Sequence, residues 1–338
     1  MIAGIARLLF RIAIFLGLTV ILVIAGASLW FHEASQQKGR VTTDILFYVP
    51  AGSSHQQIRQ TMIDQNIISH PVYYAAMRLS FALLDGASFA PKAGEFLLPA
   101  GASLHDVFVI IDEGKAYQHR FLVTEGTASL DIIRQLNREE KLSGKIASIP
   151  AEGSLAADTY FFVRDESREN LLSRMQKAQE LILAEEWALR QPGLPYQSPK
   201  EALIMASIIE KETGIIDEQP LVSSVFINRL RKKMRLQSDA TTLYGIIQNE
   251  GRARTIRKSD LTEKTKWNTY RIDGLPPTAI GNPGRAAIKA ALNPVPSRYF
   301  YFVANGKGGH NFAKTLAEHN KNVQAYRAIM KNQKDGKE

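Results

Sequence analysis

The stretch Ser198-Pro-Lys-Glu-Ala-Leu-Ile-Met-Ala-Ser-Ile-Ile-Glu-Lys-Glu-Thr213 predicts one buried helix with both of its ends marked. Ser198 can accept a hydrogen bond from a free backbone N–H, Pro199 suits the first helical position, and Glu201 can complete a capping box. Gly214 follows, where glycine readily adopts a left-handed cap. Because most of the circumference between these ends is apolar, we expect the helix to lie inside its domain.

Two carboxylates occupy the last turn of this helix. At about 3.6 residues per turn, Glu212 lies on the aliphatic face that carries Ile208 and Ile209, whereas Glu210 points to another side. A carboxyl group on an aliphatic surface loses hydration, which raises its pKa. If it keeps its proton near neutral pH, it can protonate a leaving group. The alternative is an ordinary last-turn residue paired with one of the arginines downstream.

Length and charge set the broad class. The chain has 338 residues, enough for a membrane segment and two or three small domains. It contains no cysteine, which excludes a disulfide framework and a thiolate metal site. The net charge is +9, and residues 228–271 hold twelve Lys and Arg against four Asp and Glu. A basic segment of this size indicates binding to a nucleic acid, a lipid surface or an acidic polymer. The alternative is a solvated basic face that binds no partner.

The N-terminal region predicts a membrane anchor. Residues 12–31 carry no charge, and about twenty apolar residues suffice to cross a bilayer as a helix. Arg7 and Arg11 precede this run, which places the N-terminus in the cytoplasm. Ala25-Gly-Ala27 resembles a signal-peptide cleavage site, but the apolar run continues past it and favours an uncleaved anchor. Either interpretation puts the chain after about Glu33 outside the cytoplasm, which argues against a nucleic-acid partner.

A sequence motif that predicts a short strand, a glycine turn and a serine-capped helix occurs three times after the anchor. Its copies are Val49-Pro-Ala-Gly-Ser-Ser54, Leu98-Pro-Ala-Gly-Ala-Ser103 and, more loosely, Val123-Thr-Glu-Gly-Thr-Ala-Ser129. The helices that follow turn apolar residues inward, namely Ile58, Val107 with Ile110, and Ile132 with Leu136. The motif resembles the LysM glycan-binding module, a small fold of two strands and two helices. We expect one such domain over residues 42–117, its middle filled by a helix over Tyr73–Leu84.

The region after Glu212 is rich in polar and aromatic side chains. A long helix is expected over residues 168–191 before it and a second over Leu221–Leu230. Loops dense in Gly, Pro and Asn follow at Gly274–Pro277 and Ile280–Gly284, and such loops often line a groove. Amide, hydroxyl and aromatic groups on them suit a neutral sugar polymer. Loop architecture alone is the favoured explanation for their prolines and for Gly284.

Several motifs occur in order along the chain. They are Ala206-Ser-Ile-Ile-Glu-Lys-Glu-Thr213, Val225-Phe-Ile-Asn-Arg-Leu230, Leu236-Gln-Ser-Asp-Ala-Thr241, Trp267-Asn-Thr-Tyr270, Gly274-Leu-Pro-Pro277, Asn282-Pro-Gly284, and Tyr301-Phe-Val-Ala304 with Gly309-His-Asn-Phe312. With the anchor and the LysM-like region, they resemble the endolytic murein transglycosylase family, also called YceG-like. The resemblance covers nearly the whole chain. It implies an α+β fold with a cytoplasmic stub and transmembrane helix over residues 1–33, a small LysM-like ββαα-type domain over 42–117, and a mixed α/β catalytic domain over 118–330.

The resemblance also implies a reaction. It is cleavage, without water, of the β-1,4 bond between N-acetylmuramic acid and N-acetylglucosamine inside nascent glycan strands, which leaves a 1,6-anhydro end and terminates the strand. Glu212, the second glutamate of the Glu-Lys-Glu step, corresponds to the catalytic acid, which then acts as a base. The nucleophile is the 6-hydroxyl of the substrate, so no second carboxylate is required, in contrast to ordinary two-acid glycosidases.

Cofactors, partners and location follow from the same resemblance. No cofactor and no metal are expected. The expected partners are peptidoglycan glycan strands, the membrane through a single N-terminal span, and peptidoglycan synthases. The expected location is the bacterial inner membrane, with the catalytic domain in the periplasm. A non-catalytic peptidoglycan-binding scaffold stays open as the alternative function.

Further candidates for the site come from the polar clusters. Four side chains are expected to position the substrate: Asn228, Gln237, Asn268 and Tyr270. Asp239 is the candidate for a second, assisting acid, against the slightly favoured alternative that it caps a helix over Ala240–Ile246. His310 is either a groove residue or, as we favour, a residue that fixes a turn beside Gly308 and Gly309.

The sequence departs from the family pattern at two places. Ala156-Ala157 precede Asp158, where the family usually has an aromatic residue and a proline. Thr278-Ala279 follow the double proline, where Gly-Pro or a close variant is common. Both departures leave the shape of the substrate subsites open.

Overall fold

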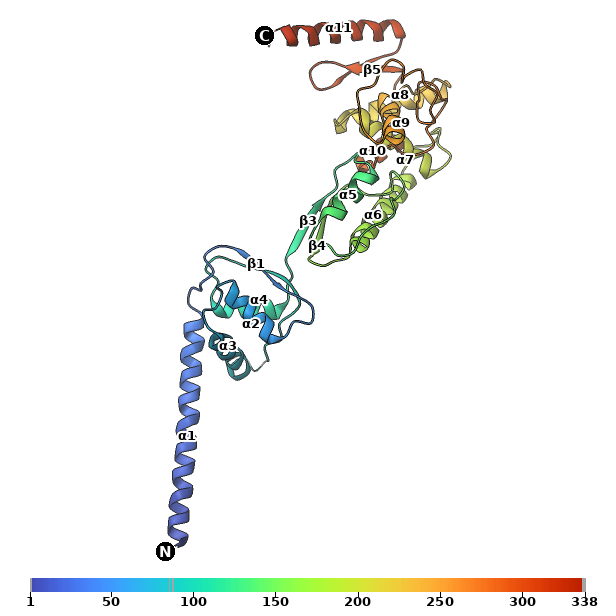
Figure 1. Cartoon of the computed structure of the whole chain (residues 1–338). Coiled ribbons are helices and arrows are strands. Elements are labelled where there is room, and N and C mark those ends of the chain that lie inside the picture. The colour runs from blue at the N-terminus through green and yellow to red at the C-terminus, as the bar shows by residue number, and fades with distance from the viewer. Residues whose placement is uncertain (1, 85, 87, 336–338) are drawn as a thin grey trace. The chain divides into compact units, whose positions relative to one another are not determined.

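The computed structural model describes residues 2–84, 86 and 88–335. Met1, Asp85 and Ala87 fall in the predicted segments 1–33 and 42–117 but lie outside the described residues. The protein has a mixed α+β fold with one long apolar helix at its N-terminus, as expected (Figure 1). It divides into two compact units, Met1–His119 and Arg120–Glu338.

The first unit consists of the long N-terminal helix and a small α+β body. Its elements are α1 (Ile2–Ser35), β1 (Ile45–Val49), α2 (His55–Asp64), α3 (Pro71–Leu84), β2 (Gly94–Leu98) and α4 (Leu104–Glu113). The segment Arg7–Ser35 of α1 is long and apolar enough to cross a membrane, and none of its most apolar window is buried in the structure. This property fits either a membrane span or a signal sequence.

The core of the first unit lies between its two-stranded sheet and its helices. β1 and β2 pair antiparallel with Phe47 opposite Phe96, and both rings are fully buried. Ser54 and Ser103 cap α2 and α4 as predicted, each within a complete capping box. Of the apolar residues expected to face inward, Ile58 and Val107 are buried and Ile110 is partly buried against the core.

The second unit carries the remaining elements around two hydrophobic cores. They are β3 (Gln118–Leu122, which begins at the end of the first unit), α5 (Ser129–Arg138), β4 (Thr159–Val163), α6 (Arg168–Ala188), α7 (Pro199–Glu212), the 3₁₀ turn η1 (Ile216–Glu218), α8 (Gln219–Arg231), α9 (Asp239–Glu250), α10 (Arg285–Leu292), β5 (Tyr301–Ala304), β6 (His310–Ala313) and α11 (Leu316–Asp335). β3 pairs with β4, and β5 pairs antiparallel with β6. One core lies between α5, α6 and the β3–β4 pair, and the other gathers around α7.

The helix α7 is the buried centre of the second core, as predicted. It packs against α6, α8, α9 and α10. Ser198 accepts a hydrogen bond from the Glu201 N–H, and Pro199 is the first helical residue. The predicted capping box is incomplete, because the Glu201 carboxylate accepts from the Gln197 N–H instead of returning to Ser198. The left-handed cap predicted at Gly214 was wrong, since the helix ends on Thr213 in extended conformation.

The third copy of the strand–glycine–serine–helix motif, residues 123–129, differs from the other two. Ser129 was expected to cap the following helix, but it is the first residue of α5, whose cap position, Ala128, provides no side-chain bond. The Glu152 carboxylate accepts from the Ser129 N–H at 3.0 Å in its place. A carboxylate brought from another segment therefore satisfies the helix end that the local sequence leaves open.

Asn282 fastens the β3–β4 region to the helical core of the second unit. Its side-chain oxygen accepts from the Leu155 N–H at 2.9 Å, and its amide nitrogen donates to the Thr127 carbonyl at 2.9 Å and the Ser129 hydroxyl at 3.1 Å. The side chain is fully buried. The segment that follows the double proline is thereby tied to the start of α5 and to the loop before β4.

Candidate functional site

Glu212, the last residue of α7, lines an open cleft of about 350 Å³ in the second unit. The other lining residues come from α8, the segment before α9, the first residue of α9, the Trp267–Tyr270 motif, β5 and α11. They are Phe226, Arg229, Leu236, Gln237, Asp239, Tyr270, Tyr301, Phe302, Leu316 and His319. The side chain of Glu212 is partly buried, next to the fully buried Ile208 and Ile209. Helix geometry therefore gave the correct face for this carboxyl group.

The surroundings of Glu212 favour its protonated form. Burial raises the pKa of the carboxyl group above its ordinary value, and the negative charge of Asp239 adds to the rise. The Ser238 hydroxyl donates a hydrogen bond to Glu212 Oε1 and opposes the rise, as do the charges of His310 and Arg229. The net effect is a raised pKa, which is the property that a general acid needs near neutral pH.

Ser238 is itself held by a buried network of hydroxyl groups. Its N–H donates to Thr269 Oγ1 at 2.9 Å, and that oxygen lies 2.8 Å from Thr241 Oγ1. Ser238 occupies the cap position of α9, but its side chain makes no capping bond there. The hydroxyl group is therefore available for Glu212.

The alternative of an arginine ion pair with Glu212 finds no support. Among the described residues, no Arg or Lys nitrogen lies within ion-pair distance of the Glu212 carboxylate. Arg229 lines the same cleft, but its Nε donates to the Phe300 carbonyl and its Nη1 to the Leu236 carbonyl, both at 2.6 Å. Its guanidinium also lies over the Tyr301 ring at 5.3 Å. Arg229 thus braces the cleft wall and leaves Glu212 open to a ligand.

Asp239 and Tyr270 form a polar pair in the lining of the cleft. The Tyr270 hydroxyl donates to Asp239 Oδ1 at 2.8 Å. Burial and this bond raise the pKa of Tyr270, so its hydroxyl stays protonated at neutral pH. Asp239 is the first residue of α9 and does not cap it, in contrast to the alternative from the sequence.

Gln237 is an exposed residue at the edge of the cleft. Its φ of 53° is in the left-handed region, which is uncommon for a residue other than glycine. The backbone is held there by a hydrogen bond from the Gln237 N–H to the Thr269 carbonyl at 3.2 Å. Unusual backbone conformations of this kind often occur at binding sites.

The structure places Asn228 and Asn268 outside the cleft lining and gives both another role. Asn268 is 0% exposed and donates to the carbonyls of Asp260 and Glu263 at 2.8 and 2.6 Å. Asn228 donates to the carbonyls of Ser297 and Tyr299 at 3.1 and 3.0 Å. A side chain without exposed surface does not touch a saccharide, so Asn268 fixes the loop before Tyr270.

His310 and Glu218 form a pair beside the cleft that the sequence did not reveal. His310 begins β6, opposite Ala304, and directly follows Gly308 and Gly309. Its Nδ1 lies 2.7 Å from Glu218 Oε2, and its N–H donates to Glu218 Oε1 at 3.0 Å. A Cβ at Gly309 would lie 2.6 Å from Glu218 Oε1, so a side chain there would require the carboxylate to shift.

The second carboxylate of α7, Glu210, lies away from the cleft, as helix geometry predicted. Burial raises its pKa, and the nearby charge of Glu125 adds to the rise. Glu210 Oε2 accepts from the Gly284 N–H at 3.0 Å, a bond that lowers the pKa. Glu210 therefore fastens the Asn282–Gly284 motif and offers a comparison residue for Glu212.

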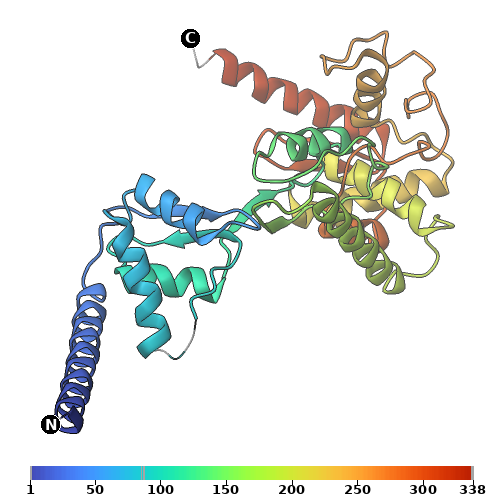
Figure 2. The ribbon, with the colours of Figure 1, turned by 60° about the horizontal axis from the view of Figure 1, so that its bottom comes forward.

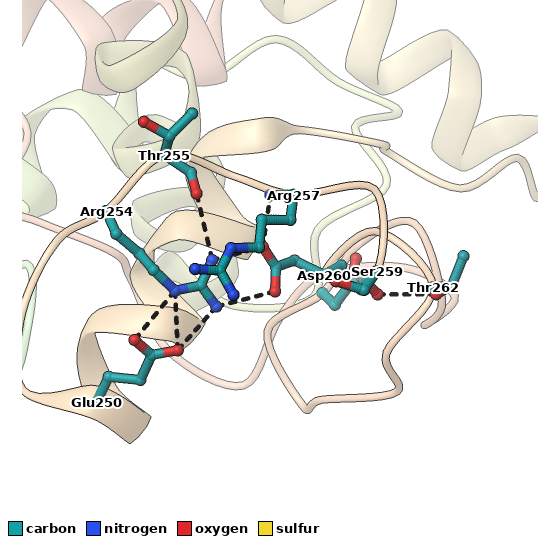
Figure 3. A network of polar contacts seen from close by, with 8 residues as sticks. Glu250, Arg254, Thr255, Arg257, Ser259, Asp260 and Thr262 are labelled. Atoms are coloured by element: carbon teal, nitrogen blue, oxygen red, sulfur yellow. Dashed lines mark hydrogen bonds and ion pairs between the residues drawn. The ribbon is translucent and has the colours of Figure 1, made fainter.

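Part of the basic block is used inside the fold. Figure 3 shows Arg254 between the carboxylates of Glu250 and Asp260. The distance from Arg254 Nη2 to Glu250 Oε1 is 2.7 Å, and that from Arg254 Nη1 to Asp260 Oδ2 is also 2.7 Å. The Arg254 guanidinium and the Arg257 N–H hold the pKa of Asp260 at about 2. Asp260 is buried, and its carbonyl accepts from Asn268. Arg254 thus orders the loop that leads to the Trp267–Tyr270 motif.

The residues at the two departures from the family pattern, Ala156-Ala157 and Thr278-Ala279, do not line the cleft. Ala156 is buried, and its N–H donates to the Met175 carbonyl at 3.1 Å. Thr278 accepts a hydrogen bond from Trp267 Nε1 at 3.0 Å, and Ala279 is buried close to Gly153. Both departures are thus accommodated in the packing around the site.

Comparisons with known proteins agree on one family. The model of a family described as "YceG-like family" matches residues 47–325. An endolytic murein transglycosylase of Bacillus subtilis (strain 168) is 30% identical over 340 residues, which are 90% of this chain and 91% of that protein. An endolytic murein transglycosylase of Streptococcus pneumoniae (strain D39) is 30% identical over 177 residues, 51% of this chain and 31% of that protein. A crystal structure of a yceG-like protein from Listeria monocytogenes is 31% identical, covers 83% of this chain and 99% of that chain, and has a TM-score of 0.49.

Proposed function

Because this chain belongs to the YceG-like family, we propose that it is an endolytic lytic transglycosylase of peptidoglycan. It cleaves the β-1,4 bond between N-acetylmuramic acid and N-acetylglucosamine within nascent glycan strands. The product end is a 1,6-anhydro sugar, and its formation terminates the strand.

One observation carries this proposal: a carboxyl group with a raised pKa lies in an open cleft lined by aromatic and polar side chains. Such a group is protonated at a pH where an ordinary glutamate is ionised, so it can donate a proton. The ring of Tyr270 offers a flat surface for a sugar, and Gln237 and Asp239 offer polar contacts. The site has the groups that recognition of a neutral saccharide requires.

The reaction proceeds in two proton transfers at Glu212. The acid first donates its proton to the bridging oxygen, and the bond between that oxygen and the anomeric carbon breaks. The 6-hydroxyl of the same sugar then attacks the anomeric carbon, and the Glu212 carboxylate takes the proton of that hydroxyl. The carboxyl group ends in its starting state, and no water molecule is consumed.

The protonation state of Glu212 is set by neighbours with opposite effects. Burial favours the neutral acid before the first transfer, and the Ser238 hydroxyl stabilises the carboxylate after it. The charge of Arg229 favours the same ionised state. Asp239, held by Tyr270, is available to orient a sugar hydroxyl group.

We assign the chain to the bacterial inner membrane on the basis of α1. The helix acts as a single span with its N-terminus in the cytoplasm, because Arg7 and Arg11 precede the apolar run. Residues 42–117 form a LysM-like glycan-binding domain and residues 118–330 the catalytic domain, both in the periplasm. Peptidoglycan synthases are the partners that produce the strands on which it acts.

Substitution of Glu212 tests the catalytic proposal. Glu212→Gln keeps an oxygen that accepts from Ser238 but cannot donate a proton, so we expect a folded protein without activity. Glu210→Gln is the matched control, because it changes the neighbouring carboxyl outside the cleft and should retain activity. Mass spectrometry of products from purified glycan strands distinguishes anhydro ends from reducing ends.

Three outcomes would contradict the proposal in different ways. Anhydro ends released by Glu212→Gln at the wild-type rate would remove Glu212 from the mechanism. Reducing ends would identify a hydrolase. Sedimentation of the wild-type protein with peptidoglycan without new chain ends would identify a non-catalytic scaffold, which is the alternative function.

Stability measurements separate loss of chemistry from misfolding. A carboxyl group whose pKa is raised in the folded state contributes stability that is present at acidic pH and lost as the pH rises through the folded-state pKa. Glu212→Gln removes the penalty for ionisation above that pKa. We therefore expect the variant to be at least as stable as the wild type at pH 8, by thermal unfolding.

A further inference from the structure

The helix α3 presents an apolar face to solvent. Its opposite face is buried in the core of the first unit through Tyr74, Met77 and Phe81. Outward lie Val72, Leu79 and Leu83, with 56%, 48% and 54% of their surface exposed. These three positions are seven and four residues apart and fall on one line along the helix. Such a long exposed apolar stripe is unusual for a surface that meets only water.

The residues around this stripe make the face more apolar still. Pro71, Ala75 and Ala82 are exposed beside it, and the exposed cation Arg78 lies at its margin. No Asp or Glu occurs between residues 65 and 84. A helix that combines an apolar face with a flanking cation and no acidic residue is suited to the surface of an anionic membrane.

The helix α3 also packs against the C-terminal end of α1, the proposed membrane span. The rings of Phe31 and Tyr73 lie 6.3 Å apart, and His32 Nδ1 lies 3.3 Å from the Ser80 hydroxyl. Figures 1 and 2 both show α3 beside the C-terminal end of α1. Tyr73 and Ser80 are two turns apart on α3, whereas Phe31 and His32 are neighbours on α1. The helix α3 therefore crosses the end of α1 and does not run along it.

We propose that α3 lies in the bilayer interface, with its Val72–Leu79–Leu83 stripe among the lipid acyl chains. The inference rests on the proposed membrane span of α1, whose exposed apolar surface ends at the level of Phe31. A helix that crosses α1 at this level lies at the boundary between hydrocarbon and headgroups, about 5–10 Å deep.

Aromatic and basic residues at the same level support a lipid partner. Trp30 is exposed near the end of α1, where amphipathic rings favour the membrane interface. Lys38 and Arg40 follow α1, and neither forms an ion pair within the part of the chain that the structure describes. Together with Arg78, they provide cations for lipid phosphates. The contact fixes how the first unit sits on the membrane.

The absence of cysteine from the chain permits a direct test with single reporters. The full-length protein is reconstituted in liposomes of phosphatidylethanolamine and phosphatidylglycerol after Leu79→Cys or Leu83→Cys substitution and labelling with an environment-sensitive dye. Gln56→Cys, at an exposed position of α2, is the matched control, and Ile21→Cys reports on the span itself. Lipids with a nitroxide near the headgroup act as shallow quenchers, and lipids with a nitroxide deep in the acyl chain act as deep quenchers.

We expect shallow quenchers to lower the fluorescence at Leu79 and Leu83 about twofold and to leave Gln56 unchanged. If Ile21 is quenched by deep nitroxides while Leu79 and Leu83 behave like Gln56, the span stands and the inference about α3 is overturned. If no reporter is quenched, including Ile21, the anchoring fails and the inference fails with it.

A protein partner on the same face is a separate outcome of this experiment. It would protect Leu79 and Leu83 from aqueous iodide without any quenching by nitroxide lipids, and that result would overturn the inference. Thermal unfolding of each labelled variant checks the fold; because the substituted side chains are exposed, we expect no change in the transition.

Discussion

The hydroxyl group of Ser238 should set the pH range in which this protein is active. It donates to the Glu212 carboxylate, and it makes no capping bond within α9. The substitution Ser238→Ala removes this donor and leaves the helix cap otherwise unchanged. Because the bond stabilises the ionised carboxyl, its loss should raise the pKa of Glu212 further.

The size of the effect follows from the charge on the acceptor. A hydrogen bond to an ionised group contributes about 1.5 kcal/mol, and about 1.4 kcal/mol corresponds to one pKa unit. The general acid is active when protonated, so kcat/KM falls as the pH rises through the pKa of Glu212. Ser238→Ala should therefore move the alkaline limb of the kcat/KM profile upward by about one pH unit.

The assay is release of anhydro-ended fragments from purified glycan strands between pH 4 and pH 9. Ser223→Ala is the control, since the buried Ser223 hydroxyl makes no hydrogen bond within the described residues and its loss should leave the profile unchanged. A shift of the alkaline limb to lower pH in Ser238→Ala would refute the reasoning. It would mean that the Ser238 hydroxyl accepts a hydrogen bond from neutral Glu212 and does not donate one to its anion.

Three other substitutions probe the surroundings of the acid. Tyr270→Phe removes the bond to Asp239, worth about 1 kcal/mol, and should lower kcat/KM about fivefold without a change in circular dichroism; an unchanged kcat/KM would exclude the pair from substrate binding. Asn282→Ala removes three buried hydrogen bonds. It should lower the free energy of unfolding, measured by urea denaturation, by about 3 kcal/mol. A loss below about 1 kcal/mol would contradict the role of Asn282 in fastening the β3–β4 region. Gly309→Ala forces Glu218 Oε1 away from a new methyl group at 2.6 Å and should cost about 1–2 kcal/mol in thermal unfolding, whereas wild-type stability would show that the carboxylate moves freely.

Local sequence was sufficient for the helix that presents the acid. The serine and proline at its start, together with its apolar pattern, predicted α7 and the side on which Glu212 lies. Its C-terminal cap was not predictable, because Gly214 permits several conformations and the packing selected an extended Thr213. The cap of α5 came from Glu152, more than twenty residues away, which no local pattern reveals.

The composition of the cleft depended on contacts between distant segments. Asn228 and Asn268 carry the same amide as a sugar-binding residue, and only tertiary structure shows that backbone carbonyls occupy their N–H groups. The roles of Ser238 and Arg229 could not be predicted, because neither is near Glu212 in sequence. Ser238 and Arg229 lie in sequence motifs that resemble the family. A motif alone does not reveal which of its side chains points toward Glu212.

Because residues far apart in the sequence line the cleft, activity should appear only after the last of them has folded into place. Glu212 precedes Tyr301 by roughly ninety residues and His319 by roughly a hundred, and both residues line the same cleft as the acid. Contacts between such distant segments form late, after the intervening chain has been ordered. A chain synthesised only as far as α10 would hold the acid without the side of the cleft that Tyr301 and Phe302 form, so an unfinished molecule should be unable to cut the polymer around it.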